Sequence, residues 1–99
     1  MIGYYTRFTT KPEDREKLVE LLSHATKAMD AVVGCKLYEV SLDATNPAVT
    51  SVNEIWTDEE AHDASLQNDD AKALIAQAMP FLTDKPKQAK LGPVITSWA

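Results

Sequence analysis

The sequence predicts an α+β domain of the ferredoxin-like type, a βαββαβ chain whose helices cover one face of an antiparallel sheet. Four segments are rich in β-branched and aromatic residues, as strands are, and two segments carry apolar residues three and four positions apart, as amphipathic helices do. These segments follow one another in the order strand, helix, strand, strand, helix, strand. The 99 residues suffice for one hydrophobic core, so we expect a single domain over residues 1–99.

The first strand and the first helix are expected in residues 1–29. In residues 1–9 the even-numbered side chains share one face of a strand, and this face should be the one that meets the helices. Thr10 and Glu13 then have the spacing of a capping box, and Pro12 suits a first helical turn, where its missing N–H is no loss. The helix that follows has one apolar face, formed by Leu18, Leu21, Leu22, Ala25 and Met29.

Two further strands are expected to pair as an antiparallel hairpin. Gly34 can adopt the left-handed conformation that ends a helix, and a strand is then expected from Cys35 to Leu42. A loop follows over residues 43–47, and a third strand is expected from Thr50 to Trp56. Because the two strands lie at hairpin distance in the sequence, they should be neighbours in the sheet.

The second helical region is expected in two parts. Thr57 and Glu60 repeat the spacing of a capping box, so a helix should open at Asp58 and break near Gln67. Asn68 then offers a new N-cap, and acidic residues follow it in the first turn of the next helix. Both parts should lie on the same face of the sheet as the first helix.

A last strand is expected from Pro86 to Trp98, with an interruption at Gly92 and Pro93. Several strands carry large side chains at neighbouring positions, as in Ile55 beside Trp56, so both faces of the sheet have apolar groups. Since the helices cover only one face, the other should pack against a second copy of the chain. We therefore expect a symmetric homodimer.

The charge balance limits the partners. Ten Lys and Arg residues against fifteen Asp and Glu residues leave a net charge of −5, which repels phosphate backbones and anionic membrane surfaces, so we expect neither nucleic acid nor a membrane as a partner. The apolar runs are also too short to span a bilayer. Cys35 is the single cysteine and no leader-like segment opens the sequence, so a cytoplasmic location is expected.

Few motifs in the sequence carry chemistry. There is no G-x-S-x-G turn, no glycine-rich phosphate loop and no ligand spacing typical of a metal site, so we expect no metal and no cofactor. Cys35 has apolar neighbours, which favours an inert thiol over a reactive pair with His24 or His62. His24 is interpreted as a surface residue on the first helix. His62 follows Trp56 by six residues at a strand-to-helix junction, where it could exchange a proton beside an aromatic wall, although Trp56 could also be core.

The segments Gly34-Cys35-x-x-Tyr38-Glu39 and Glu54-x-Trp56-x-Asp58-x-Glu60-Ala61-His62 resemble the antibiotic biosynthesis monooxygenase superfamily. The resemblance spans nearly the whole chain and implies a dimeric α+β barrel with a pocket between helices and sheet. Members oxidise phenols or quinols with O₂ and no cofactor, or degrade haem. In the cofactor-free reaction the bound phenol or anthrone is deprotonated and its electron-rich anion reduces O₂ directly.

The resemblance implies a set of site residues. His62 is the expected proton acceptor, Trp56 the aromatic wall, and Asn53 or Thr6 orients the oxygen substituent of the substrate. The residues expected as apolar lining are Tyr4, Phe8, Leu66 and Phe81.

Two departures from the family pattern keep other functions open. Ser65 stands where relatives often carry a second histidine, which favours a non-catalytic or stress-related ligand-binding protein as the alternative. Thr6 stands where haem-degrading relatives carry asparagine, so haem degradation is a third and weaker option. The leading prediction is a cofactor-independent monooxygenase that acts on a small aromatic phenol, quinol or anthrone.

Overall fold

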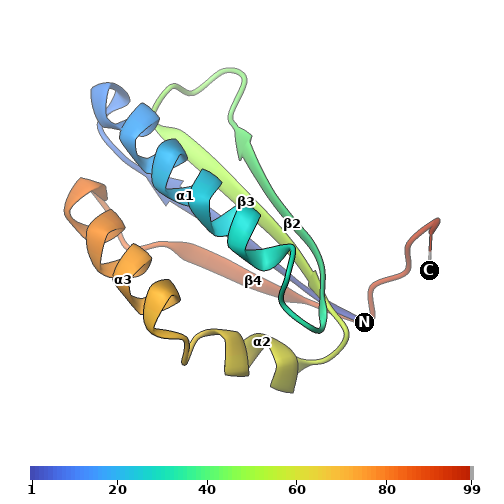
Figure 1. Cartoon of the computed structure of the whole chain (residues 1–99). Coiled ribbons are helices and arrows are strands. Elements are labelled where there is room, and N and C mark those ends of the chain that lie inside the picture. Colours follow the sequence, from blue (N-terminus) through green and yellow to red (C-terminus); the bar gives the residue numbers. More distant parts are fainter. Residues whose placement is uncertain (99) are drawn as a thin grey trace.

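A computed structural model describes residues 1–98 as a four-stranded antiparallel sheet with three helices (Figure 1). The strand order is β2-β3-β1-β4, which confirms the predicted ferredoxin-like fold. In chain order the elements are β1 (Ile2–Thr9), η1 (Pro12–Asp14), α1 (Arg15–Met29), β2 (Cys35–Leu42), β3 (Val49–Trp56), α2 (Glu59–Ser65), α3 (Asp69–Ala78), η2 (Met79–Phe81) and β4 (Lys87–Leu91), where η marks a short 3₁₀ turn.

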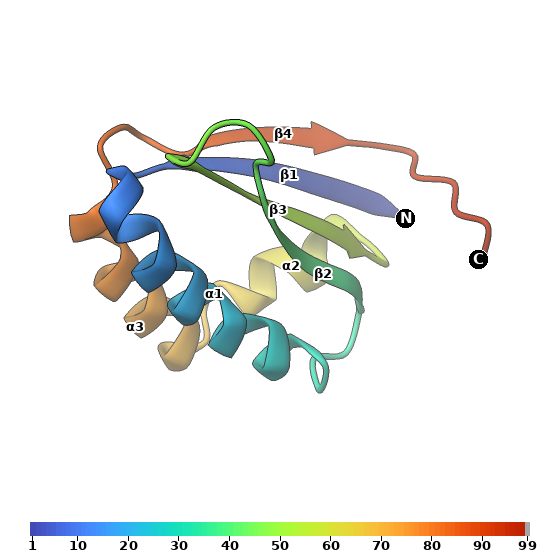
Figure 2. The ribbon, with the colours of Figure 1, turned by 90° about the horizontal axis from the view of Figure 1, so that it is seen from above.

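The helices lie on one side of the sheet, and the other side carries no helix (Figure 2). Helices α1 and α3 run side by side across the sheet, and α2 lies at the end where β3 stops. In the sheet Thr6 is opposite both Val52 and Gln88, so the even-numbered positions of β1, β3 and β4 share the helix-facing side. The predicted orientation of the first strand is therefore correct.

The core between sheet and helices is small and centres on two fully buried side chains, Leu18 of α1 and Trp56 of β3. Leu18 belongs to the apolar stripe predicted for the first helix, and Ala25 of the same stripe is also buried. Trp56 ends β3 on the helix-facing side, where it meets α2. This large ring therefore joins the sheet to the helix that carries His62.

One predicted helix cap is confirmed and two are wrong. The Asn68 side chain accepts a hydrogen bond from the Asp70 amide, as predicted for an N-cap. The N-cap of α2 is Asp58, whose side chain accepts from the Ala61 amide, and not Thr57 as the capping-box spacing implied. The capping box predicted at Thr10 is wrong. Thr10 still belongs to the sheet, since its amide donates to the Ala48 carbonyl, and its hydroxyl is used locally.

Gly34 fixes the passage from α1 into β2. Its φ of +93° lies in the left-handed region, as predicted. Its carbonyl accepts a hydrogen bond from the Thr57 amide at 2.9 Å, and a Cβ added to Gly34 would lie only 2.7 Å from the Ala61 Cβ. The start of β2 is thus held tightly against the first turn of α2.

A β-bulge follows directly. Cys35 pairs with Trp56 and Leu37 pairs with Ile55, so Lys36 is an extra residue on β2. Because of this extra residue, Tyr38 comes to lie opposite Glu54 on the helix-facing side, and Leu37 lies on the side without helices.

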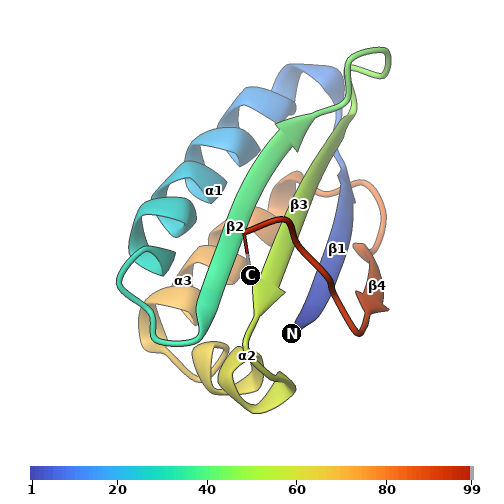
Figure 3. The same cartoon turned by 90° about the vertical axis from the view of Figure 1, so that its right-hand side faces the viewer.

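The last strand is shorter than predicted. β4 ends at Leu91 rather than continuing to Trp98, because Pro93 has no N–H for a sheet ladder. Beyond it the Val94 amide donates to the Met1 carbonyl at 2.8 Å. Figure 3 shows this C-terminal segment leaving the sheet beside the N-terminus.

Candidate functional site

A cavity of about 660 Å³ lies between the helix-facing side of the sheet and helices α1 and α3. Its volume is within the range of small-molecule sites, roughly 300 to 1,000 Å³. The walls from the helices are largely aliphatic, and the main contributors are Leu21, Leu22, Met29, Leu74, Ile75 and Met79. The sheet supplies the floor, in which polar side chains stand among apolar ones.

Most polar side chains of the lining are already engaged. Gln88 Nε2 donates to Thr6 Oγ1 at 3.0 Å, Ser65 Oγ donates to the His62 carbonyl at 2.6 Å, and Asn68 caps α3. The Tyr38 hydroxyl makes no hydrogen bond to any of the residues 1–98. Tyr38, with a free O–H, and its neighbour Glu54 are therefore the pair of floor groups best placed to bind a polar ligand.

Glu54 is the carboxyl group in the floor of the cavity, and Asp70 of α3 is a second carboxyl group in the lining. Its side chain is only 11% exposed, and its Oε1 accepts a hydrogen bond from Trp56 Nε1 at 3.1 Å. Burial raises the pKa of Glu54, while the Trp56 hydrogen bond and the nearby His62 act in the opposite direction. A carboxyl with a raised pKa is a stronger base once it is ionised, which suits it to proton transfer.

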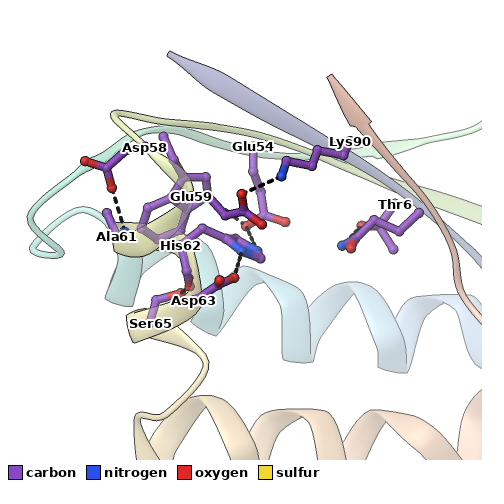
Figure 4. A network of polar contacts seen from close by, with 11 residues as sticks. Thr6, Glu54, Asp58, Glu59, Ala61, His62, Asp63, Ser65 and Lys90 are labelled. Atoms are coloured by element: carbon purple, nitrogen blue, oxygen red, sulfur yellow. Dashed lines mark hydrogen bonds and ion pairs between the residues drawn. The ribbon is translucent and has the colours of Figure 1, made fainter. Parts of the chain in front are cut away.

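His62 lies next to Glu54 (Figure 4), and it is not among the residues that line the cavity. Its ring stacks on Tyr4, with 3.8 Å between ring centroids, and meets the Trp56 ring edge to face at 5.5 Å. Its Nε2 is 4.0 Å from Glu54 Oε1, and its Nδ1 is 3.2 Å from Asp63 Oδ1. The imidazole is buried between two aromatic rings and faces a carboxyl group on each side.

The group formed by Glu54, His62 and Asp63 reaches solvent at Asp63. The Asp63 side chain is 62% exposed, and beside it a surface ion pair joins Lys90 Nζ to Glu59 Oε2 at 2.6 Å (Figure 4). Glu54, His62 and Asp63 therefore form a line of titratable groups that leads from the cavity floor to the surface.

The structure brings some of the predicted site residues together in the cavity lining, namely Thr6, Phe8 and Leu66. Tyr4, Trp56 and His62 are close to one another, and Trp56 and His62 are close to Glu54, but none of the three lines the cavity. The expectation that Trp56 forms a wall against the ligand is therefore wrong, since its ring is completely buried and donates to Glu54.

Two predicted residues lie elsewhere. Asn53 is opposite Tyr5 and Glu39 on the side of the sheet without helices, because strand residues three positions apart, such as Asn53 and Trp56, point to opposite faces. Phe81 lies outside the cavity with Lys17 Nζ 5.6 Å from its ring centre, and Leu82 takes the expected place in the lining.

Sequence reasoning missed Tyr38 and Glu54 as site residues, although both belong to the motifs that carried the resemblance. For Glu54 a signal was present, since it shares strand parity with Trp56. For Tyr38 the signal was hidden by the bulge at Lys36, which shifts the alternation of β2 by one residue.

The other two residues considered for chemistry, Cys35 and His24, have no part in the cavity. Cys35 is half-buried, and burial raises the pKa of its thiol, which agrees with an inert cysteine. His24 is exposed on α1. Residues 1–98 contain no group of three or more His, Cys, Asp or Glu side chains that could hold a metal ion, and none of their helices is long and apolar enough to cross a membrane.

Comparison with known proteins identifies the family. Residues 1–77 match the sequence model of the family described as antibiotic biosynthesis monooxygenase. The chain belongs to the antibiotic biosynthesis monooxygenase family. This confirms the resemblance drawn from the two motifs. A search of curated proteins found no match.

Solved structures share the fold of this family member. A structure described as antibiotic biosynthesis monooxygenase has 17% identity and a TM-score of 0.87, over 96% of this chain and 100% of that one. Rv0793 from Mycobacterium tuberculosis has 22% identity and a TM-score of 0.88, over 97% of both chains. NE2512 from Nitrosomonas europaea, a protein of unknown function, has 23% identity and a TM-score of 0.82, over 97% and 91%. At these identities the likeness concerns the fold alone.

Proposed function

We propose that this family member is a cofactor-independent monooxygenase that oxidises a small aromatic phenol, quinol or anthrone with O₂. The observation that carries the proposal is Glu54, a largely buried carboxyl group in the floor of a largely aliphatic cavity. A fused aromatic ring system fits between sheet and helices in the available volume of about 660 Å³. The family membership of the chain supports the reaction type.

In the proposed reaction Glu54 takes a proton from the bound substrate, which leaves an electron-rich anion. The anion passes electrons to O₂ and a new C–O bond forms. For an anthrone, the methylene carbon becomes a carbonyl, and the second oxygen atom leaves as water with both methylene hydrogens, one of them returned by Glu54. The aliphatic walls exclude water from the anion, and the protein contributes orientation and proton transfer.

His62 assists this step through its contact with Glu54. Sequence reasoning made His62 the direct proton acceptor, but Glu54 lines the cavity and His62 does not. A protonated imidazole 4.0 Å from Glu54 Oε1 favours the ionised carboxylate, and Asp63 on its far side links it to solvent. We therefore assign proton acceptance to Glu54 and a positioning role to His62 and Trp56.

The test is O₂ uptake by metal-free protein with a panel of anthrones and quinols. Glu54→Gln keeps the acceptor for Trp56 Nε1 but cannot take a proton, so kcat should fall about 10²- to 10⁴-fold. Glu39→Gln, an exposed carboxylate on the opposite side of the sheet, is the matched control and should leave kcat unchanged. Uptake no faster than the uncatalysed reaction across the panel would refute the monooxygenase.

Ser65 motivates the second candidate, a ligand-binding protein without turnover. The Ser65 hydroxyl donates a hydrogen bond to the His62 carbonyl. Ser65 therefore offers no proton-transfer group at the position where relatives often carry histidine. Saturable binding of the same aromatic panel with no O₂ uptake would favour this candidate. Haem is a poorer fit, because neither His24 nor His62 lines the cavity and so neither can reach its iron.

We also propose that a second copy of the chain covers the side of the sheet without helices. Apolar side chains gather there at odd-numbered positions, among them Tyr5 and Leu91, which are 37% and 51% exposed, together with Leu37 and Ile55. Face-to-face packing would remove these groups from water and give the dimeric barrel that the resemblance implies.

A further inference from the structure

We infer that Tyr38 determines substrate specificity by donating a hydrogen bond to an acceptor oxygen that neighbours the ionising hydroxyl of the substrate. The inference rests on the proposed function, because it takes Glu54 as the group that receives the proton. It adds a chemical requirement: the preferred ligand carries a hydroxyl and a carbonyl oxygen on the same edge of a fused ring system.

The first support is placement. Tyr38 and Glu54 are direct cross-strand partners on the helix-facing side of the sheet, and both line the cavity. Side chains opposite each other in an antiparallel pair have Cβ atoms about 4.5–5.5 Å apart. A donor and an acceptor therefore stand side by side on the floor, and they match a ligand whose acceptor and donor atoms are neighbours too.

The second support is the protonation state. Burial raises the pKa of Tyr38, and the nearby Glu54 and Cys35 raise it further, so the phenol keeps its proton near neutral pH. Tyr38 is thus an O–H donor and cannot replace Glu54 as the base. The two neighbours have distinct tasks, donation by the tyrosine and acceptance by the glutamate.

The third support is that Tyr38 is the polar side chain of the floor that stands directly beside Glu54 and has no hydrogen-bond partner among residues 1–98. Thr6 and Gln88 bond to each other. The walls opposite are largely aliphatic, and their polar side chains, Ser65, Asn68 and Asp70, lie outside the sheet that carries Glu54. A carbonyl oxygen bound against this floor finds its donor in Tyr38, and a ligand without that oxygen leaves the tyrosine O–H unpaired when it displaces water.

The inference predicts a preference that binding alone can measure. The probes are 1-hydroxyanthraquinone, which has the carbonyl beside its hydroxyl, and 1-hydroxyanthracene, which has the same ring frame without it. Binding is followed anaerobically by calorimetry with the full chain. The wild type should bind the quinone about tenfold more tightly, the factor that one hydrogen bond to a neutral group supplies. Tyr38→Phe should remove this preference and change the affinity for 1-hydroxyanthracene less than twofold.

Tyr5→Phe is the matched control, because Tyr5 lies on the opposite side of the sheet and bonds Ser51 at 3.1 Å. It should leave both affinities unchanged. An equal loss of affinity for both probes in Tyr38→Phe would mean that the ring only packs, and would overturn the inference while O₂ uptake by the wild type still supported the proposed function. Failure of the wild type to bind either probe would also overturn the inference, while the proposed function stands or falls on O₂ uptake with the substrate panel.

Discussion

Replacing Gly34 with alanine is expected to destabilise the fold by about 2–5 kcal/mol, because a backbone effect and a steric effect act together. The φ of +93° at Gly34 lies where a Cβ is strained, which costs about 1–2 kcal/mol. The new Cβ would also lie 2.7 Å from the Ala61 Cβ, whereas carbon atoms pack at about 3.5–4.0 Å. Either α2 or the start of β2 must move, and overpacking of this kind costs about 1–3 kcal/mol.

Urea unfolding followed by tryptophan fluorescence measures the loss, and the melting temperature should fall by at least about 8 °C. Gly92→Ala is the control, since its Cβ would meet Ile2 Cγ2 at an ordinary 3.5 Å. Ala61→Gly separates the two effects: alone it costs about 1 kcal/mol, but combined with Gly34→Ala it removes the overlap. The double variant should therefore be more stable than the sum of the single effects predicts. Additive effects, or a Gly34→Ala within about 0.5 kcal/mol of wild type, would refute the reasoning.

Two further measurements address the cavity carboxyl and the assembly. Because burial raises the pKa of Glu54 above 4.5, the stability that its proton gives is present below pH 4.5 and lost as the pH rises through the raised value. Glu54→Gln should therefore gain stability relative to wild type between acid and neutral pH in urea unfolding, and an identical pH dependence would contradict the burial of this group. Light scattering should give twice the chain mass of 10.9 kDa for the wild type and a single chain mass for Leu91→Glu, while a monomeric wild type would refute the dimer.

The order and type of the elements could be predicted from the sequence because they depend on local periodicity. Alternation in β1 and the apolar stripe around Leu18 each fix a buried face without knowledge of the rest of the chain. Boundaries depend on partners that lie far away in the sequence. Thr10 has the right neighbours for an N-cap, but the Ala48 carbonyl keeps its amide in the sheet.

The site was predicted only in part, for a related reason. Strand parity alone separates Asn53 from Trp56, so the local pattern already contained that correction. Which side chain meets the cavity is a different question, since it depends on what packs in front. Trp56 and His62 lie in the correct region, yet of the three residues only Glu54 lines the cavity, and no periodicity reveals which one does.

The bulge at Lys36 separates two fixed points of the chain. On one side the Gly34 carbonyl is bound to Thr57, and on the other Tyr38 is paired with Glu54. Between these points β2 has one residue more than β3, and Lys36 is that extra, unpaired residue. Deletion of Lys36 would therefore leave Leu37 opposite Ile55 and Tyr38 opposite Glu54. Related chains can therefore vary by one residue between helix and strand while the polar pair on the cavity floor stays the same. An alignment that places such a gap after Tyr38 would instead exchange the residues of the two faces of β2.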